Sequence, residues 1–311
     1  KGVVWMDFTQ WIIYMGAAIC ALIIGLNILP DAAASFDLVG ELGKLQVFNL
    51  GGGSGYTLWG GVIGGAMLSM ASHGTDQLIV QRILSCKNVG DSKKAMIGSG
   101  IIVFIQFVLF LFIGVMLYMV WNGAGFEVLG ITKPDELFTK FIIENLPPVV
   151  KGLTVAGIFA ASMTTLSGSL SAMSSSITVD IFKPIFKGIT DEGKWLKISR
   201  ITTLCWGIIL VFGAMIFTNQ SSPLVVIGLS IASFTYGGTL GVFIVVRFFK
   251  KCDLWQYVVP FFFSISVMTF IIIAGWQGLF KINWTWYTFI GVISSLFLNR
   301  LLVLLKKPQA E

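Results

Sequence analysis

The stretch GIFAASMTTLSGSLSAMSSSITVD, residues 157–180, combines apolar side chains with a high density of Ser and Thr. With the residues before it, the stretch is long enough to cross the hydrocarbon core of a bilayer, which takes about 20 helical residues. Polar side chains at membrane depth are costly, and those that persist there commonly mark a binding site or a helix contact. The stretch is therefore predicted to be a membrane-spanning helix that carries function.

The whole chain is apolar enough to predict an integral membrane protein. Of its 311 residues, 56% are hydrophobic and only 12% are charged, and its mean hydropathy is +0.87. A water-soluble globule of this size needs far more polar surface. The net charge of +6 is better explained by basic cytoplasmic loops than by nucleic-acid binding, so no nucleic-acid partner is expected.

Apolar windows predict an all-α protein of about eight transmembrane helices in a single domain over residues 1–311. The expected helices lie near residues 4–28, 57–82, 95–121, 150–182, 197–218, 223–248, 255–276 and 284–305. Most of the 21 Lys and Arg fall near the two ends and in alternate connections, after residue 82, in 183–200 and in 247–251. Because cytoplasmic loops are enriched in Lys and Arg, we expect a multi-pass protein of the cell membrane with both ends cytoplasmic. The abrupt start at Lys1, directly before an apolar segment, suggests a fragment.

Two of the connections between helices have features of their own. Residues 29–56 end in the run Gly51–Gly55 and are expected to be a flexible connector, because the Lys and Ser/Thr of a phosphate-binding loop do not follow. Residues 133–148, KPDELFTKFIIENLPP, have amphipathic spacing and predict a short external helix on the membrane surface. That helix could serve as a lid or as a structural cap.

The second expected helix, LWGGVIGGAMLSMASHGTDQLIVQR, residues 58–82, breaks the rules for a plain membrane helix. Its pairs of glycines, 60 with 64 and 61 with 65, are typical of close packing against a neighbouring helix. Farther on, residues 72–77 place six poor membrane residues together, which predicts an interrupted helix whose freed backbone groups face a cavity. His73 and Asp76 could suggest a proton relay or a hydrolase, but no nucleophile or metal motif supports catalysis, so no enzyme is expected.

A cation site is indicated by the spacing in residues 157–180. Ala161, Thr164, Thr165 and Gly168 share one helix face, so a carbonyl and two hydroxyls can converge on one point. Neutral hard oxygens suit a dehydrated monovalent cation, since a divalent ion would require more carboxylates. Asp7, in the first helix, either caps that helix at the interface or is a buried anion that helps to hold a cation.

At these residues the chain resembles the sodium/solute symporter family, which includes sodium-coupled sugar, proline, sialic-acid and vitamin transporters. The resemblance rests on four motifs in order: VVWMDFTQ at 3–10, TDQLIVQR at 75–82, the stretch 161–180 followed by IFK at 181–183, and SFTYG at 233–237. It extends over the whole chain. It implies the leucine-transporter fold of two inverted five-helix repeats, with residues 1–28 as the last helix of repeat one, 57–248 as repeat two, and 255–305 as two appended helices. The first four core helices would then be missing from this chain.

The resemblance also implies a sodium ion as cofactor and places the main sodium site in the helix quoted first. Its ligands would be the carbonyl of Ala161 and the hydroxyls of Thr164 and Thr165. Relatives that bind a second sodium use the aspartate matched by Asp7 with hydroxyls one turn beyond the first site. Ser167 supplies one of these hydroxyls here, and the next position is a glycine.

The family's substrate contacts and gate lie on the broken sixth core helix, whose matching residues here are Ser72, His73, Gly74 and Gln77. The function implied is sodium-driven symport of a small polar organic solute, such as a sugar, polyol, amino acid or organic acid, by alternating access. The missing helices of the same protein and the lipid bilayer are the other partners expected. Two alternatives stay open: a non-transporting membrane sensor or assembly partner derived from a transporter half, and a proton-coupled carrier in which Asp7 or His73 titrates.

Overall fold

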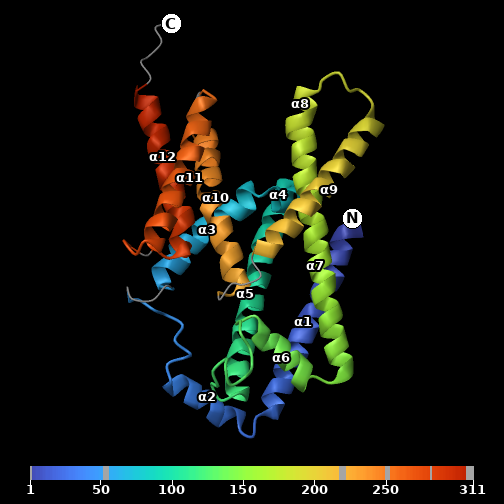
Figure 1. Ribbon diagram of the computed structural model, residues 1–311, viewed down its shortest axis with the longest axis vertical. Helices are drawn as coiled ribbons and strands as arrows, with labels where there is room; N and C mark the ends of the chain where they lie inside the picture. The colour runs from blue at the N-terminus through green and yellow to red at the C-terminus, as the bar shows by residue number, and fades with distance from the viewer. Residues whose placement is uncertain (1, 52–55, 217–221, 249–252, 281, 306–311) are drawn as a thin grey trace. The chain divides into compact units, whose positions relative to one another are not determined.

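The computed structural model describes residues 2–51, 56–216, 222–248, 253–280 and 282–305 (Figure 1). Within these ranges every regular element is a helix. The chain divides into two compact units, each described here by itself. Unit 1 contains Lys1–Leu45 and Cys86–Pro223, and unit 2 contains Gln46–Ser85 and Leu224–Glu311.

Unit 1 is built on three long helices. These are α1 (Gly2–Ile28), α5 (Val89–Val120) and α7 (Pro148–Ser176), and α1 packs against both of the others. Beyond α7 the chain continues through a π-helical turn (Ile177–Phe182) into the short α8 (Lys183–Ile185) and then into α9 (Glu192–Ile216), which packs on α7. The order of the long helices confirms the expected ones, with ends that differ by a few residues.

Two short helices complete unit 1, α2 (Ala32–Glu41) and α6 (Glu136–Asn145). Both are anchored by apolar side chains in a buried cluster that they share with α1 and α5, including Val39 of α2 and Phe141 and Ile142 of α6. The amphipathic helix expected in 133–148 is therefore present. The expectation of a flexible connector over 29–56 is wrong for residues 32–41, because Asp31 caps α2 and burial of Val39 fixes it. Residues 52–55 of the glycine-rich run lie outside the described residues.

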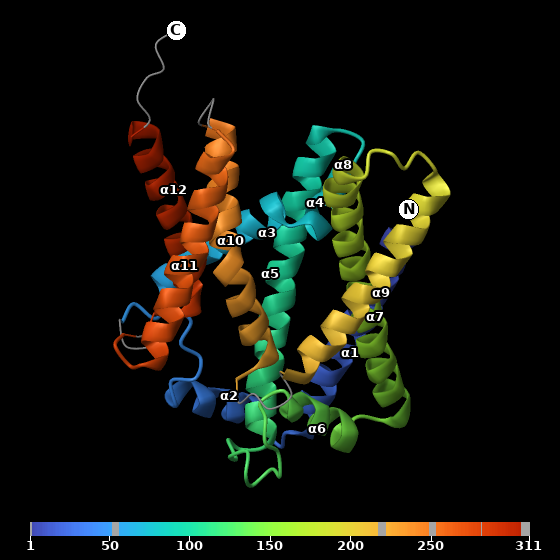
Figure 2. The same cartoon turned by 45° about the horizontal axis from the view of Figure 1, so that its top comes forward.

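Unit 2 packs a broken segment onto three helices. The segment comprises a π-helical turn (Gly60–Gly64), α3 (Gly65–Thr75) and α4 (Gln77–Leu84). The three helices are α10 (Leu224–Phe248), α11 (Trp255–Trp276) and α12 (Tyr287–Leu305), with a 3-10 turn (Trp284–Trp286) before α12. They lie side by side in both ribbon views (Figure 1, Figure 2).

Glycines set the closest contacts in unit 2, as the small-residue pairs predict. A Cβ at Gly64 would lie 2.0 Å from the carbonyl oxygen of Thr285, and one at Gly237 would lie 2.7 Å from the Cα of Gly291. The two backbones in each pair therefore approach too closely for any side chain at the glycine. A Cβ at Gly65, by contrast, would meet no heavy atom within 4 Å. Only one of the two glycine faces makes the contact.

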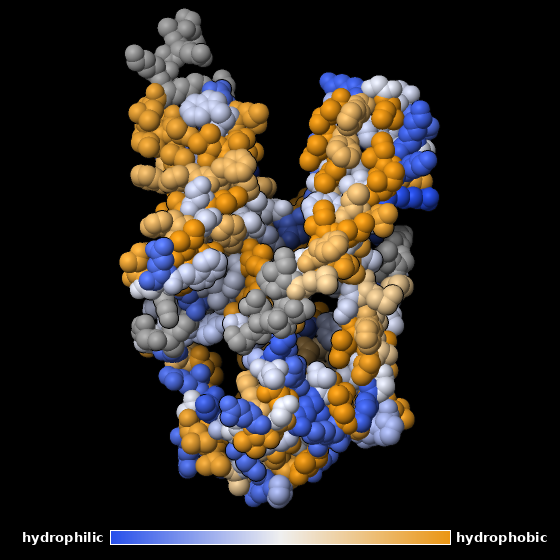
Figure 3. All heavy atoms as spheres, in the orientation of Figure 1, coloured by the Kyte–Doolittle hydropathy of each residue, from blue (hydrophilic) through white to orange (hydrophobic). Residues whose placement is uncertain are grey.

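Seven helices in the described part of the chain are long and apolar enough to cross a membrane. They start at Trp5, Val89, Pro148, Glu192, Leu224, Trp255 and Trp284. The eighth expected helix, 57–82, is not among them, and its helical path is interrupted at Asp76. Apolar side chains gather on the visible surfaces of α7, α9, α11 and α12, as lipid-facing helices require (Figure 3). The protein is a multi-pass membrane protein.

Candidate functional site

The hydroxyl-rich helix α7 lies antiparallel to α1 in unit 1. Two contacts fix their register: Thr164 donates its hydroxyl hydrogen bond to Oε1 of Gln10, and Gly157 lies against Ile13 and Tyr14. Moving toward the start of α1 therefore corresponds to moving toward the end of α7. A glycine at 157 lets the two helices approach, since a Cβ there would lie 3.2 Å from Cγ2 of Ile13.

The two threonine hydroxyls at the expected cation position each bond back to a carbonyl of α7. The hydroxyl of Thr165 donates to the carbonyl of Ala161 at 2.9 Å, and the hydroxyl of Thr164 donates to the carbonyl of Ala160 at 3.1 Å. The two oxygens of one such pair are close enough to contact one hard cation, whose bonds to oxygen are about 2.3–2.6 Å long in the case of calcium. The structure thus pairs Thr165 with Ala161, whereas Thr164 contacts Ala160 and the amide oxygen of Gln10.

The two residues expected at a second cation site lie on the same pair of helices. The hydroxyl of Ser167 donates to the carbonyl of Thr164 at 3.1 Å and is exposed, whereas Asp7 is half-buried. Asp7 lies one turn before Gln10, and Ser167 lies one turn after Thr164. Because α1 and α7 are antiparallel, Asp7 and Ser167 are displaced in the same direction from the Gln10–Thr164 contact. The register therefore places the carboxylate at about the level of the Ser167 hydroxyl.

A second polar contact joins α1 to α5 next to this group. Gln106 accepts hydrogen bonds from Nε1 of Trp11 and from the hydroxyl of Tyr14, each at 3.2 Å. Tyr14 also borders a cavity of about 360 Å³, which is lined mainly by apolar side chains and reaches Ala161 and Ser162. The cavity leads to the helix turn that carries the Ala161 carbonyl, so the oxygen group is not sealed inside protein.

The interrupted helix predicted in unit 2 is confirmed, and its break lies at Asp76. α3 ends at Thr75, Asp76 has an extended backbone (φ −77°, ψ 118°), and α4 starts at the next residue. One carboxylate oxygen of Asp76 accepts from the backbone N–H of Leu78 at 2.9 Å and so caps α4. The cap stabilises the new helix start, while the carbonyls at the end of α3 lose their helical partners.

The expected substrate or gate residues surround this break. The hydroxyl of Ser72 donates to the carbonyl of Ser69 at 3.1 Å, and Nδ1 of His73 lies 3.0 Å from both that carbonyl and the Ser72 hydroxyl. Gly74 is half-buried, and Gln77, the first residue of α4, is exposed. Ser72 and His73 thus bond within their own helix turn in this conformation.

A contact that the sequence did not predict fixes the break to α10. Tyr236 donates its hydroxyl hydrogen bond to the second carboxylate oxygen of Asp76, and the hydroxyls of Thr75 and Thr239 lie 3.4 Å apart. Both members of the Tyr236–Asp76 pair lie within motifs that stand out in the sequence, 75–82 and 233–237. The pairing itself depends on the tertiary packing of α3 on α10, which no local pattern encodes.

Comparison with known proteins gives a consistent match. The family model for "Sodium:solute symporter family" matches residues 2–256. The human sodium/iodide cotransporter is 26% identical over 265 residues, which cover 81% of this chain and 40% of that protein. The sodium/sialic acid symporter NanT of Aliivibrio fischeri (strain ATCC 700601 / ES114) is 26% identical over 71% of this chain and 45% of its own length. The chain therefore spans about two fifths of the curated relatives that it matches.

A solved structure shares the fold. The substrate-bound outward-open state of a Na⁺-coupled sialic acid symporter superposes with a TM-score of 0.77 at 21% identity, covering 99% of this chain and 63% of that one. This similarity confirms the expected fold class, an all-α membrane protein with the leucine-transporter type of fold.

Proposed function

The chain belongs to the sodium:solute symporter family, and we propose on this basis that it takes part in sodium-coupled uptake of a small polar organic solute by alternating access. Its relatives are transporters, not enzymes. Sodium is the coupling ion in the names of these relatives. Because the chain spans about two fifths of their length, we expect further helices of the same protein to complete the pathway.

The proposed sodium ligands are the Ala161 carbonyl and the hydroxyls of Thr164 and Thr165. The observation that supports this assignment is the 2.9 Å separation between the Thr165 hydroxyl and the Ala161 carbonyl. A bound cation would replace this internal hydrogen bond by two bonds to the ion. An ion favours the conformation in which its ligands are complete, so binding here would shift the balance between outward-open and inward-open states.

A second cation is proposed between Asp7 and Ser167, supported by the helix register that puts them at one level. The break at residues 72–77 is proposed as the substrate and gate region, with Ser72, His73, Gly74 and Gln77 as contacts. Broken helices supply such contacts in secondary transporters because their free backbone groups can bind a solute near the midplane.

The solute is proposed to be an organic acid in the first instance. Relatives of this chain are named for sialic acid and for monocarboxylates, and both solutes carry a carboxylate. A sugar, polyol or amino acid is the wider class. Both ends of the chain are proposed to be cytoplasmic, on the distribution of Lys and Arg among the connections.

The test is uptake into proteoliposomes by the full-length protein, with sialic acid, a short monocarboxylate, glucose and proline as probes. Sodium and pH gradients are imposed separately. Thr165→Ala removes one oxygen and is expected to weaken the apparent affinity for sodium by roughly 10-fold to 100-fold, as for the loss of one bond to a charged group. Solute affinity at saturating sodium should change little, and Thr165→Ser, which keeps the oxygen, serves as the matched control.

Two results would argue against the proposal. If Thr165→Ala weakens sodium affinity and solute affinity equally, Thr165 is not a sodium ligand. Uptake that persists without sodium but collapses with the pH gradient would favour a proton-coupled carrier instead.

A further inference from the structure

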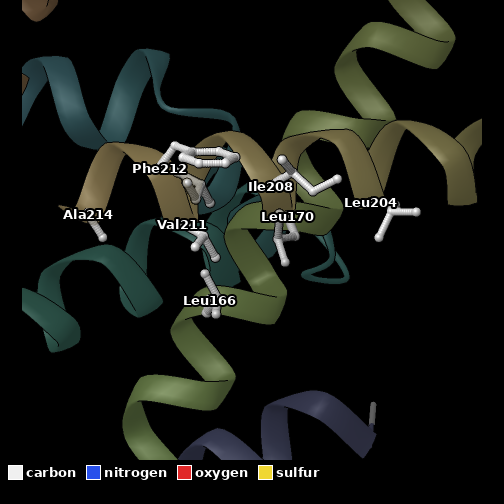
Figure 4. Close-up of a pocket in the computed structure, with 9 residues that line it drawn as sticks. Leu166, Leu170, Leu204, Ile208, Val211, Phe212 and Ala214 are labelled. Carbon is white, nitrogen blue, oxygen red and sulfur yellow. The ribbon is translucent and has the colours of Figure 1, made fainter. Parts of the chain in front are cut away.

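The contact of Asp76 with Tyr236 joins the broken segment of unit 2 to α10. Both partners belong to this chain, so further helices are not needed to complete the contact. An open apolar face is different, because the further helices that we expect can cover it. The pocket in unit 1 where Leu166 of α7 lies next to Val211 of α9 is such a face (Figure 4).

Asp76 uses both of its carboxylate oxygens at the break. One oxygen accepts from the backbone N–H of Leu78 at 2.9 Å, which caps α4, and the other accepts from the hydroxyl of Tyr236. The extended backbone of Asp76 also separates α3 from α4. A single residue therefore links the end of α3, the start of α4 and α10.

Tyr236 stands on a helix that has little freedom to move. α10 and α12 approach so closely that a Cβ at Gly241 would lie 2.6 Å from the Cβ of Ser295. The ring of Tyr236 packs against a buried cluster that contains Ala71 of α3 and Leu240 of α10. Because closely packed side chains keep their positions, the Tyr236 hydroxyl is a fixed donor for the carboxylate at the break.

The proposed solute contacts lie on both sides of Asp76. Ser72, His73 and Gly74 belong to α3, and Gln77 is the first residue of α4. The placement of these two groups relative to each other depends on the backbone at Asp76. A bond that fixes Asp76 therefore pre-organises the contacts, which increases affinity because binding has less ordering to impose.

We propose that Tyr236 is a positioning residue for solute binding, which acts by holding the carboxylate of Asp76. The inference rests on the proposed function, because the solute contacts are those proposed above. Tyr236 fixes the geometry of the break and need not touch the solute or the ion. Sodium affinity should depend on it less, since the proposed sodium ligands lie on α7 in unit 1.

The first test is hydrogen–deuterium exchange of the purified full-length protein, measured by mass spectrometry. In Tyr236→Phe, which removes only the hydroxyl, the amides of residues 72–84 should exchange roughly tenfold faster, because a hydrogen bond to a charged group no longer opposes local opening. The acceleration should be larger there than in α12, since a loss of global stability alone would act on both.

Tyr287→Phe is the matched control for the loss of a tyrosine hydroxyl. Tyr287 is half-buried in unit 2, and its hydroxyl has no hydrogen-bond partner among the described residues. This variant should leave the exchange of residues 72–84 at the wild-type rate.

The second test is uptake into proteoliposomes at varied solute concentration, with the same probes as for Thr165→Ala. Tyr236→Phe should raise the apparent KM for the transported solute by roughly tenfold, and should change the maximal rate and the sodium affinity at saturating solute by less than about twofold. Tyr287→Phe should keep the wild-type KM. A merely structural role would instead lower the maximal rate at an unchanged KM, because less of the protein would be folded.

Three results would overturn the inference: equal changes of exchange in residues 72–84 and in α12, the same KM in Tyr236→Phe and Tyr287→Phe, or a fall in the maximal rate alone. Absence of sodium-dependent uptake by the wild-type protein would refute the proposed function instead. The exchange measurement would then still decide whether Tyr236 holds the break.

Discussion

Replacement of Gly64 by alanine should destabilise unit 2, whereas the same replacement at the adjacent Gly65 should not. A Cβ at Gly64 would lie 2.0 Å from the backbone carbonyl oxygen of Thr285, which cannot move without shifting the turn before α12. Overpacking of this kind costs about 1–3 kcal/mol. Gly65 is open, and alanine there gains the roughly 0.5–1 kcal/mol by which alanine exceeds glycine in a helix.

The assay is the thermal midpoint of the purified protein in one detergent at one scan rate. The two variants should differ by about 1.5–4 kcal/mol, which corresponds to roughly 2–6 °C between their midpoints at an unfolding entropy of about 2.1 cal/mol/K per residue over 311 residues. Gly64→Ala should lie below the wild type and Gly65→Ala at or above it. Equal midpoints for the two variants would refute the close approach of the π-helical turn to Thr285.

Three individual contacts lead to further predictions. Tyr236→Phe, which removes the hydrogen bond to Asp76, should cost about 1.5–3 kcal/mol, and its effect should be non-additive with Asp76→Asn in thermal midpoints; simple additivity would contradict the contact. Gln10→Ala should weaken the apparent sodium affinity of uptake by roughly fivefold to tenfold in the wild-type protein, but should have no further effect in Thr164→Ala. An equal loss in the wild-type protein and in Thr164→Ala would show that Gln10 does not act through Thr164. The backbone N–H of Thr132 donates to the exposed Glu136 carboxyl and holds its pKa below its ordinary value, so the stabilising effect is fully present above that ordinary value and is lost as the pH falls through the lowered pKa. The midpoints of Glu136→Gln and the wild type should therefore differ at neutral pH and converge in acid, and a constant difference would contradict this.

Much of the fold could be predicted because membrane helices leave a strong local signal. An apolar run of sufficient length must satisfy its backbone internally, so α1, α5, α7 and the later helices follow from composition alone. The break at Asp76 was also predictable, since residues 72–77 cannot continue a lipid-facing helix. The presence of α2 was missed because its stability comes from burial of Val39 in a cluster formed by distant helices.

The candidate site, like the fold, was predictable within a single helix but not between helices. Ala161, Thr164 and Thr165 lie within one helix, so their spacing alone predicts a shared site, and the structure shows the contact of Thr165 with Ala161. The contact of Thr164 with Gln10 and that of Asp76 with Tyr236 each join residues more than 150 positions apart. Such contacts are set by the packing of whole helices, and the sequence identifies only that each residue is polar at membrane depth.

The central claim is that Ala161, Thr164 and Thr165 bind the sodium ion that drives transport. The most direct test is equilibrium binding of radioactive sodium to the purified full-length protein and to the double variant Thr164→Ala with Thr165→Ala. The account predicts saturable sodium binding that loses this site in the double variant but keeps it in Thr164→Ser with Thr165→Ser. Unchanged sodium binding in the alanine variant would contradict it.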